Sequence, residues 1–98
     1  MLTEKEITEV ANKFIREIEE EAKMELLILQ KHIIKKPYGI IYFYTSKKYY
    51  ETKDDKYAVA GNAPFLVEKE TGNIVEFGTG ASEEYYILEY EAGRWPIK

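Results

Sequence analysis

The sequence predicts an α+β domain in two layers, with an antiparallel sheet of about four strands and an N-terminal and a C-terminal helix packed on one face. Three observations lead to this prediction. A helical pattern opens the chain, strand-like runs separated by short turns fill its middle, and a second helical pattern follows. Short turns favour antiparallel pairing, and helices at the two ends of the chain would cover the apolar face of such a sheet.

The first helix is predicted over residues 3–23. Thr3 is a good N-cap, and Glu6 three residues later completes a capping box. Apolar residues then recur at spacings of three and four and form one stripe: Ile7, Val10, Ala11, Phe14, Ile15, Ile18 and Ala22. The charged residues lie mainly away from this stripe, so we expect a helix that packs on a sheet and leaves a solvated outer face.

Two strands are predicted in the next part of the chain. Residues 26–34 are rich in branched side chains, and residues 40–45 form the most apolar run, which suits a central strand. Alternation places the side chains of the second run on two faces, with Ile40, Tyr42 and Tyr44 on one and Ile41 and Phe43 on the other. We expect residues 46–52 to continue or border the sheet and residues 53–57 to form a charged loop.

A β-hairpin is predicted within residues 60–80, and the rest of the chain is arranged around it. Residues 65–69 read as a strand, and the loop 70–72 ends in Gly72, which adopts a left-handed conformation without steric cost. Closing the loop there places four large side chains on one sheet face in two facing pairs: Val67 with Val75, and Phe65 with Phe77.

The last helix is predicted to begin after Ser82, which is a suitable N-cap, and to stop at Gly93. Its apolar side is formed by Tyr86, Ile87 and Tyr90. Trp95 is the only tryptophan, and the sequence leaves open whether it packs on the fold.

Length and composition limit the possible functions. Ninety-eight residues predict one domain over 1–98, and a net charge of −4 disfavours a nucleic-acid partner. The absence of cysteine removes disulfides and thiolate catalysis. No segment is apolar enough to span a membrane, and the first residues lack the features of a signal peptide, so we expect a cytoplasmic protein with no membrane contact.

The sequence shows no set of residues typical of catalysis. His32 is the single histidine, and neither Ser46 nor Ser82 has the context of a nucleophile elbow. The segment 78–80 lacks the lysine of a phosphate-binding loop. We therefore predict a protein that is not an enzyme and that uses no cofactor and no metal ion.

Nine tyrosines suggest a protein-binding surface, because tyrosine is enriched at interfaces. Tyr42, Tyr44, Tyr86 and Tyr90 are expected to fill the core, whereas Tyr38, Tyr49, Tyr50, Tyr57 and Tyr85 are better candidates for contacts. We predict a partner-binding surface in one exposed, acidic and aromatic segment between strands, formed by Tyr49, Tyr50, Glu51, Asp54, Asp55 and Tyr57.

A set of short motifs runs through residues 33–91. The most specific is A-G-N-A-P-F-L-V-E-K-E-T-G at 60–72. The others are Tyr38-Gly39 before an aromatic strand, Tyr49-Tyr50-Glu51-Thr52, Gly78-Thr79, and E-Y-Y-I-L-E-Y-E at 84–91. Together they resemble the YrhB-like, or immunity protein 35, family. Three positions depart from the usual family pattern: Ile40 stands in place of tryptophan, Lys53 in place of glycine, and Ser82 in place of a frequent proline.

This resemblance implies a small bacterial α+β domain that serves as an immunity protein of a polymorphic toxin system. Such a protein binds a cognate toxin, blocks it and needs no catalysis of its own. A general protein-binding or chaperone-like module, which shields apolar surfaces of many clients, is the alternative, and an enzyme is a third class. Binding to one partner alone favours the first, protection of unrelated proteins favours the second, and turnover that depends on one carboxylate favours the third.

Overall fold

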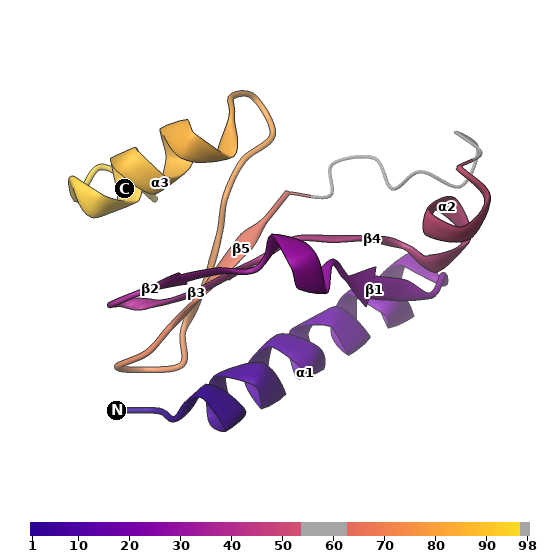
Figure 1. The fold of residues 1–98 in the computed structure, drawn as a ribbon, viewed down its shortest axis with the longest axis horizontal. Helices are drawn as coiled ribbons and strands as arrows, with labels where there is room; N and C mark the ends of the chain where they lie inside the picture. Colours follow the sequence, from indigo (N-terminus) through magenta and orange to yellow (C-terminus); the bar gives the residue numbers. More distant parts are fainter. Residues whose placement is uncertain (54–62, 97–98) are drawn as a thin grey trace.

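A computed structural model describes residues 1–53 and 63–96 (Figure 1). The helices are α1 (Glu4–Ala22), α2 (Lys47–Thr52) and α3 (Glu83–Glu91), and a short 3-10 helix spans Gln30–His32. The strands are β1 (Leu26–Ile28), β2 (Ile34–Lys36), β3 (Gly39–Tyr42), β4 (Tyr44–Ser46), β5 (Phe65–Glu68) and β6 (Ile74–Glu76). All strand pairs are antiparallel, so the predicted α+β class is confirmed.

The strands form two sheets that share one long hairpin. The larger sheet has the order β2-β3-β5-β6, and the smaller pairs β1 with β4. The predicted strand over 26–34 is split by the 3-10 helix, and the predicted strand over 40–45 is interrupted at Phe43. The Leu29 N–H donates to the Phe43 carbonyl at 2.8 Å, so the two arms of the hairpin stay connected across the interruption.

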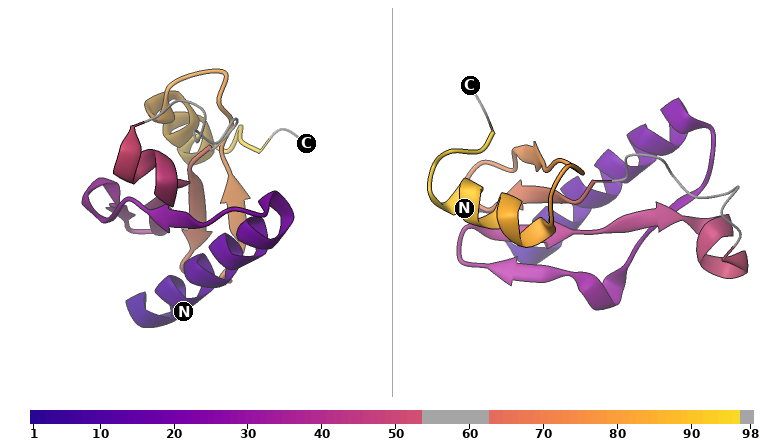
Figure 2. Two further views of the ribbon diagram at one scale, coloured as in Figure 1. Left: turned by 90° about the vertical axis from the view of Figure 1, so that its right-hand side faces the viewer. Right: turned by 90° about the horizontal axis from the view of Figure 1, so that it is seen from above.

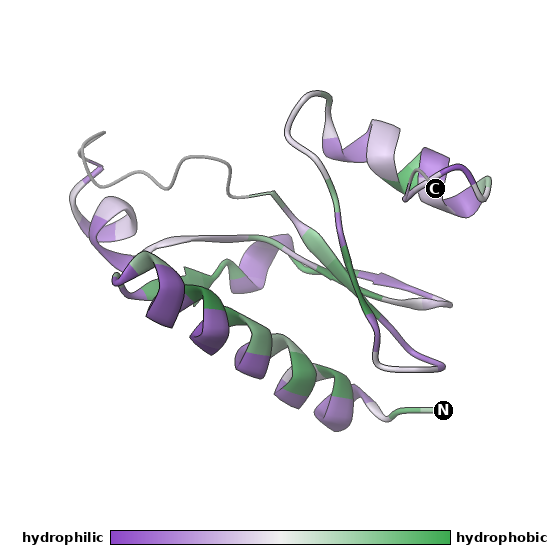
Figure 3. Cartoon of the chain, turned by 180° about the vertical axis from the view of Figure 1, so that it is seen from behind, coloured by the Kyte–Doolittle hydropathy of each residue, from purple (hydrophilic) through white to green (hydrophobic). Residues whose placement is uncertain are grey.

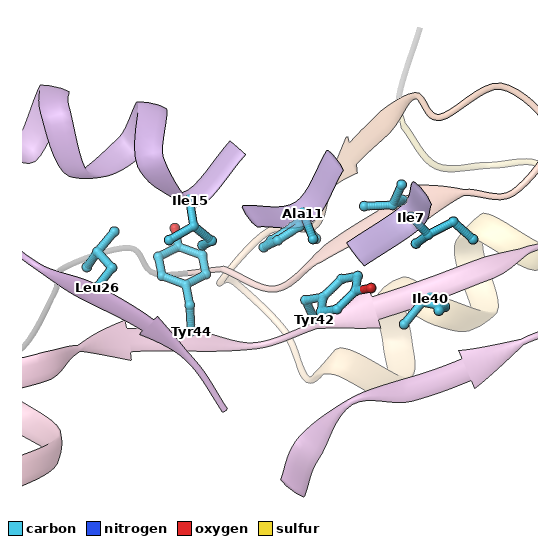
Figure 4. Packing of buried hydrophobic residues seen from close by; sticks show 9 residues of the cluster. Ile7, Ala11, Ile15, Leu26, Ile40, Tyr42 and Tyr44 are labelled. Atoms are coloured by element: carbon cyan, nitrogen blue, oxygen red, sulfur yellow. The ribbon is translucent and has the colours of Figure 1, made fainter. Parts of the chain in front are cut away.

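Helix α1 packs on one face of the sheet as predicted. The Glu6 N–H donates to Thr3 Oγ1 at 3.2 Å and the Thr3 N–H donates to Glu6 Oε1 at 2.9 Å, which confirms the capping box. The buried cluster on this side comprises Ile7, Ala11, Ile15, Leu26, Ile40, Tyr42, Tyr44, Phe65 and Val67 (Figure 4). The hydrophilic residues of α1 face away from the sheet, so the helix is apolar on one side only (Figure 3).

Helix α3 packs on the opposite face, so the prediction that both helices share one face is wrong. The second buried cluster comprises Ile41, Leu66, Phe77, Tyr86 and Ile87. Successive side chains of β3 and β5 point to opposite faces, and all of Ile40, Ile41 and Tyr42 are buried. A strand that is apolar on both faces needs cover on both, which gives the order α1, sheet, α3 (Figures 1 and 2).

The predicted hairpin is present, but its register is shifted by one residue. The pairs are Phe65 with Glu76, Leu66 with Val75, and Val67 with Ile74. The loop between the strands is one residue longer than expected, and the Gly72 N–H donates to the Glu68 carbonyl at 2.8 Å with Gly72 at φ +76°. Phe65 and Val67 therefore face α1, whereas Val75 and Phe77 face α3, and the prediction of four side chains on one face is wrong.

Two further segments bear on the predictions: one differs from the predicted structure, and the other settles a point that the sequence leaves open. The segment after β4 is the helix α2, capped by Ser46, and not a continuation of the sheet. Trp95 packs on the fold, because its Nε1–H donates to the Glu76 carbonyl at 3.1 Å and its ring lies 4.9 Å from that of Tyr86. Within the described residues, no helix combines the length and apolar character needed to cross a membrane.

Candidate functional site

Helix α2 lies at one end of the molecule, directly after β4 (Figures 1 and 2). The buried Ser46 hydroxyl accepts a hydrogen bond from the Tyr49 N–H at 3.0 Å and so fixes the start of the helix. The Lys47 N–H donates to the Glu25 carbonyl at 2.9 Å, which joins the helix to the residue before β1. Lys53 adopts φ +58° and ends the helix. This short helix is therefore fixed to the rest of the fold at its N-terminal end.

An apolar hollow lies on one side of α2. Its volume is about 330 Å³, and it is lined by Tyr50 together with Leu27, Ile28, Leu29, Gln30, Lys31 and His32. Tyr50 is 50 % exposed, so part of its ring is in contact with solvent. The Lys53 ammonium lies 4.7 Å from the centre of this ring, a cation–π distance that restricts the ring without covering it.

A larger and more polar hollow lies on the other side of α2. Its volume is about 480 Å³, and it is lined by Lys23, Met24, Glu25, Ser46, Lys47, Lys48 and Glu51. Lys47 Nζ and the Glu25 carboxylate lie 3.4 Å apart, but both side chains are at least half exposed, so this pair adds little stability. Met24 is 39 % exposed and is the apolar element of the hollow.

The structure places three of the six predicted partner-binding residues on α2. Tyr49 is half-buried, Tyr50 and Glu51 are exposed, and the last two line different hollows. Asp54, Asp55 and Tyr57 lie outside the described residues. The structure therefore brings Tyr49, Tyr50 and Glu51 onto one helix.

The predicted segment, residues 49–57, is weakly acidic, because Glu51, Asp54 and Asp55 stand against Lys53 and Lys56, which gives −3 + 2 = −1. Residues 47–57 contain four lysines, at 47, 48, 53 and 56, against the three acids Glu51, Asp54 and Asp55, which gives +4 − 3 = +1. Lys47 and Lys48, which precede the predicted residues, therefore reverse the net charge when they are counted with the segment. The net charge around α2 therefore does not by itself indicate a basic partner.

The described residues contain no group of three or more His, Cys, Asp or Glu side chains placed to hold a metal ion.

Tyr38 and Tyr90 join α3 to the sheet through hydrogen bonds to carboxylates. Tyr90 Oη donates to Glu68 Oε2 at 2.5 Å, and Tyr38 Oη donates to Glu91 Oε2 at 2.7 Å. Burial, with the adjacent Glu68 carboxylate, raises the pKa of Tyr90 to about 12.

The family of the chain follows from comparison with known sequences. The sequence model of immunity protein 35 matches residues 5–93. The chain belongs to the immunity protein 35 family. It is also 36 % identical over 53 residues to the uncharacterized protein YrhB of Escherichia coli (strain K12), a match that covers 54 % of this chain and 56 % of that protein. The chain thus aligns with little more than half the length of that relative, and no solved structure matches.

In this member of the immunity protein 35 family, exposed apolar side chains also lie on α3, at a second place that the sequence predicts only in part. Tyr85 was among the expected contact residues and is 49 % exposed, whereas Leu88 was not recognised and is 63 % exposed. The sequence contains a signal for this side, because Tyr85 and Leu88 on α3 and Ala92 at its C-cap are spaced three and four residues apart. Tyr42, Tyr44 and Tyr86 are buried as predicted, and Tyr38, expected at a contact surface, is half-buried and bonded to Glu91.

Proposed function

We propose that this chain is a non-catalytic immunity protein that binds one cognate toxin and neutralises it. The observation that carries this proposal is the match to the immunity protein 35 family over residues 5–93. Neutralisation requires only that the bound protein cover the active site or a binding site of the toxin, so no reactive group is needed. A cytoplasmic location, where a toxin would act on the producing cell, is part of the same proposal and agrees with a cysteine-free sequence.

We propose the surface around α2 as the toxin-binding surface, formed by Tyr49, Tyr50 and Glu51 together with Asp54, Asp55 and Tyr57. Tyr50 supports this choice, because a half-exposed tyrosine beside an apolar hollow is a suitable anchor for a protein interface. The Ser46 cap and the backbone bond from Lys47 fix the helix before binding, so little conformational entropy is lost when the partner docks.

The function is tested with the toxin domain encoded beside the gene. We expect co-expression to restore the growth of cells that produce this toxin, and calorimetry to give a dissociation constant near the nanomolar range. An unrelated toxin domain of similar size should not bind. Absence of binding to the adjacent toxin would contradict the proposal. Suppression of the thermal aggregation of unrelated proteins, at stoichiometric ratios, would favour the chaperone-like alternative instead.

The binding surface is tested with single substitutions. Tyr50→Ala should weaken toxin binding about tenfold or more, since truncated tyrosine anchors commonly cost more than about 1 kcal/mol. Glu51→Ala, Asp54→Ala, Asp55→Ala and Tyr57→Ala extend the test along the segment. Lys13→Ala, on the exposed face of α1, is the matched control and should bind as the wild type does. If all the α2-segment variants also bind normally, the toxin contacts another surface.

A further inference from the structure

Strand β6 forms one edge of the four-stranded sheet, and the backbone groups of two of its residues point away from β5. The Phe77 N–H donates to the Pro64 carbonyl at 2.9 Å, so the backbone groups of Phe77 face β5. Backbone groups alternate in direction along a strand, so those of Val75 face β5 as well. The N–H and C=O groups of Ile74 and Glu76 therefore point outward, where another strand could pair with them.

The opposite edge of the sheet, β2, carries features that oppose the addition of a strand, and β6 lacks them. Strand β2 contains Lys35 and Lys36 and is followed directly by Pro37. Lysine and proline on an edge strand commonly prevent pairing with another chain. Strand β6 has the sequence Ile-Val-Glu, with no lysine and no proline. Its own sequence therefore does not protect the β6 edge.

Trp95 closes the β6 edge at one end. Its indole Nε1–H donates to the Glu76 carbonyl at 3.1 Å, and this carbonyl is one of the outward-pointing groups. An added strand would lie about 4.8 Å from β6, so the indole occupies the place of its backbone. The indole also lies 4.9 Å from the ring of Tyr86, which is buried. Among the residues that the structure describes, no other hydrogen bond reaches the outward-pointing groups of Ile74 and Glu76.

The turn after α3 brings Trp95 to this edge. The Gly93 N–H donates to the Tyr90 carbonyl at 3.0 Å, and Gly93 adopts φ +77°, which ends the helix. The N–H groups of Arg94 and Trp95 both donate to the Glu89 carbonyl, at 2.8 and 3.1 Å. The Arg94 guanidinium is bonded to the Glu89 carboxylate. The position of the indole is therefore fixed by this turn as well as by its contact with the sheet.

A second copy of the chain fits a β6 edge that is not covered. In an antiparallel pair related by a two-fold axis at Val75, Ile74 of each copy lies opposite Glu76 of the other, and no two Glu76 carboxylates face each other. Both of these hydrogen-bonded pairs contain Glu76, so an indole on its carbonyl removes an acceptor from each pair. We propose that Trp95 protects the β6 edge in this way and keeps the chain from pairing with a second copy through β6.

The test compares Trp95→Ala and Trp95→Phe with the wild type in the full chain, by sedimentation over a range of concentrations. We expect the wild type to sediment as a monomer. Trp95→Ala should associate at least about tenfold more strongly, because the competing hydrogen bond and the bulk of the ring are both lost. Trp95→Phe keeps an aromatic ring beside Tyr86 but no donor, so it should associate less than Trp95→Ala does.

Tyr90→Phe is the control for a loss of stability without an open edge. Its hydroxyl bonds to Glu68 on the packed side of α3, away from the Glu76 carbonyl that Trp95 covers. This variant should sediment as a monomer. Association of Tyr90→Phe as strong as that of Trp95→Ala would show that reduced stability, and not the open edge, causes the pairing.

Hydrogen exchange of the β6 amides shows where the copies meet. In the wild type, the Val75 amide faces β5 and should exchange at least about tenfold more slowly than those of Ile74 and Glu76. In associated Trp95→Ala, the Ile74 and Glu76 amides should become protected as well. Adding Glu76→Pro removes one outward N–H and leaves the bonds to β5 in place, so it should return Trp95→Ala to the monomer. If the double variant does not fold, the exchange of Trp95→Ala decides alone.

Several results would overturn the inference. Trp95→Ala could remain a monomer like the wild type, or it could associate while its Ile74 and Glu76 amides exchange as freely as before. The wild type could also already pair through β6 with Trp95 in place. No toxin enters these measurements, so their failure leaves the proposed immunity function intact, and a failure of toxin binding leaves this inference standing.

Discussion

The two sides of the sheet are covered by helices of different character. On the α1 side, a long amphipathic helix contributes Ile7, Ala11 and Ile15 to a large apolar cluster and turns its polar face to solvent. On the α3 side, a helix half as long packs on a smaller cluster and is held in addition by two tyrosine–carboxylate bonds. Helix α1 has one such bond to a strand, from the Leu26 N–H to Glu19 Oε2 at 2.8 Å, beside a long apolar stripe. The shorter α3 combines a smaller apolar cluster with two tyrosine–carboxylate bonds.

This difference suggests a division between stability and orientation. Apolar burial is non-directional and scales with area, so the α1 side is expected to provide most of the free energy of folding. Hydrogen bonds contribute less free energy, but they fix orientation. Each substitution below tests whether the two sides differ in this way.

The largest effect is expected at the centre of the α1 side. Phe65 is fully buried, and its ring centre lies 4.7 Å from that of Phe14, 5.4 Å from that of Tyr42 and 6.1 Å from that of Tyr44. Phe65→Ala leaves a cavity among three aromatic rings and should lower the free energy of unfolding by about 3–5 kcal/mol. Urea denaturation measures this. A loss below about 1 kcal/mol would show that the α1 cluster does not provide most of the stability.

Adjacent residues of α3 test its two faces. Ile87 is 8 % exposed in the packed cluster, and Leu88 is 63 % exposed on the outer side. Ile87→Gln should destabilise the chain by about 3 kcal/mol, because an amide is placed in an apolar site, whereas Leu88→Gln should change stability by less than about 0.5 kcal/mol. Thermal unfolding of the pair checks this. Similar losses for both variants would mean that Leu88 is covered in solution.

The contact between α3 and the preceding loop gives an intermediate effect. A Cβ at Gly78 would lie 2.5 Å from Tyr86 Oη and 2.8 Å from Tyr86 Cζ, and Tyr86 is buried and cannot move freely. Gly78→Ala should therefore cost about 2 kcal/mol through overpacking. Gly80→Ala, where the nearest atom would be Tyr86 Oη at 3.5 Å, is the matched control and should be close to neutral. If the two variants lost the same stability, the Tyr86 ring would not lie against Gly78 in solution.

Local sequence signals predicted the parts of the fold that depend on neighbouring residues. The capping box at Thr3, the helix cap at Ser82 and the left-handed Gly72 were all predicted, because each is set within a few residues of chain. The family was also recognised from short motifs, and the match over residues 5–93 confirms it.

The errors concern choices that are made between distant segments. The hairpin register differs from the predicted one because the loop has one extra residue, which moves every following side chain to the other face of the sheet. The sequence offers apolar residues for either register. The placement of α3 depended on recognising that Ile41 and Leu66 need cover as much as Ile40 and Val67 do. Leu88 lies on the side of α3 away from the packed cluster, and the spacing of Tyr86, Ile87 and Tyr90 predicts only the packed side.

The smallest effect is expected at the joint between α3 and the sheet, and it should depend on pH. Tyr90→Phe removes the hydroxyl that donates to Glu68 and should cost about 1 kcal/mol near neutral pH. The pKa of Tyr90 rises from 10.0 to about 12 on folding, because burial and Glu68 disfavour the phenolate. As the pH increases, the unfolded chain ionises first, so this stabilisation is complete below pH 10 and is lost by about pH 12.

The stability difference between the wild type and Tyr90→Phe should therefore shrink between pH 10 and about pH 12. Urea denaturation at a series of pH values measures the difference directly. Glu68→Gln is the matched control, because it keeps an acceptor oxygen and removes the charge, so the pH-dependent part should decrease while part of the hydrogen bond remains. A difference that stays constant across this range would mean that the hydroxyl does not bond to Glu68 in solution. The bond between Tyr38 and Glu91 would then be the one tyrosine–carboxylate bond left to orient α3 beside its apolar packing.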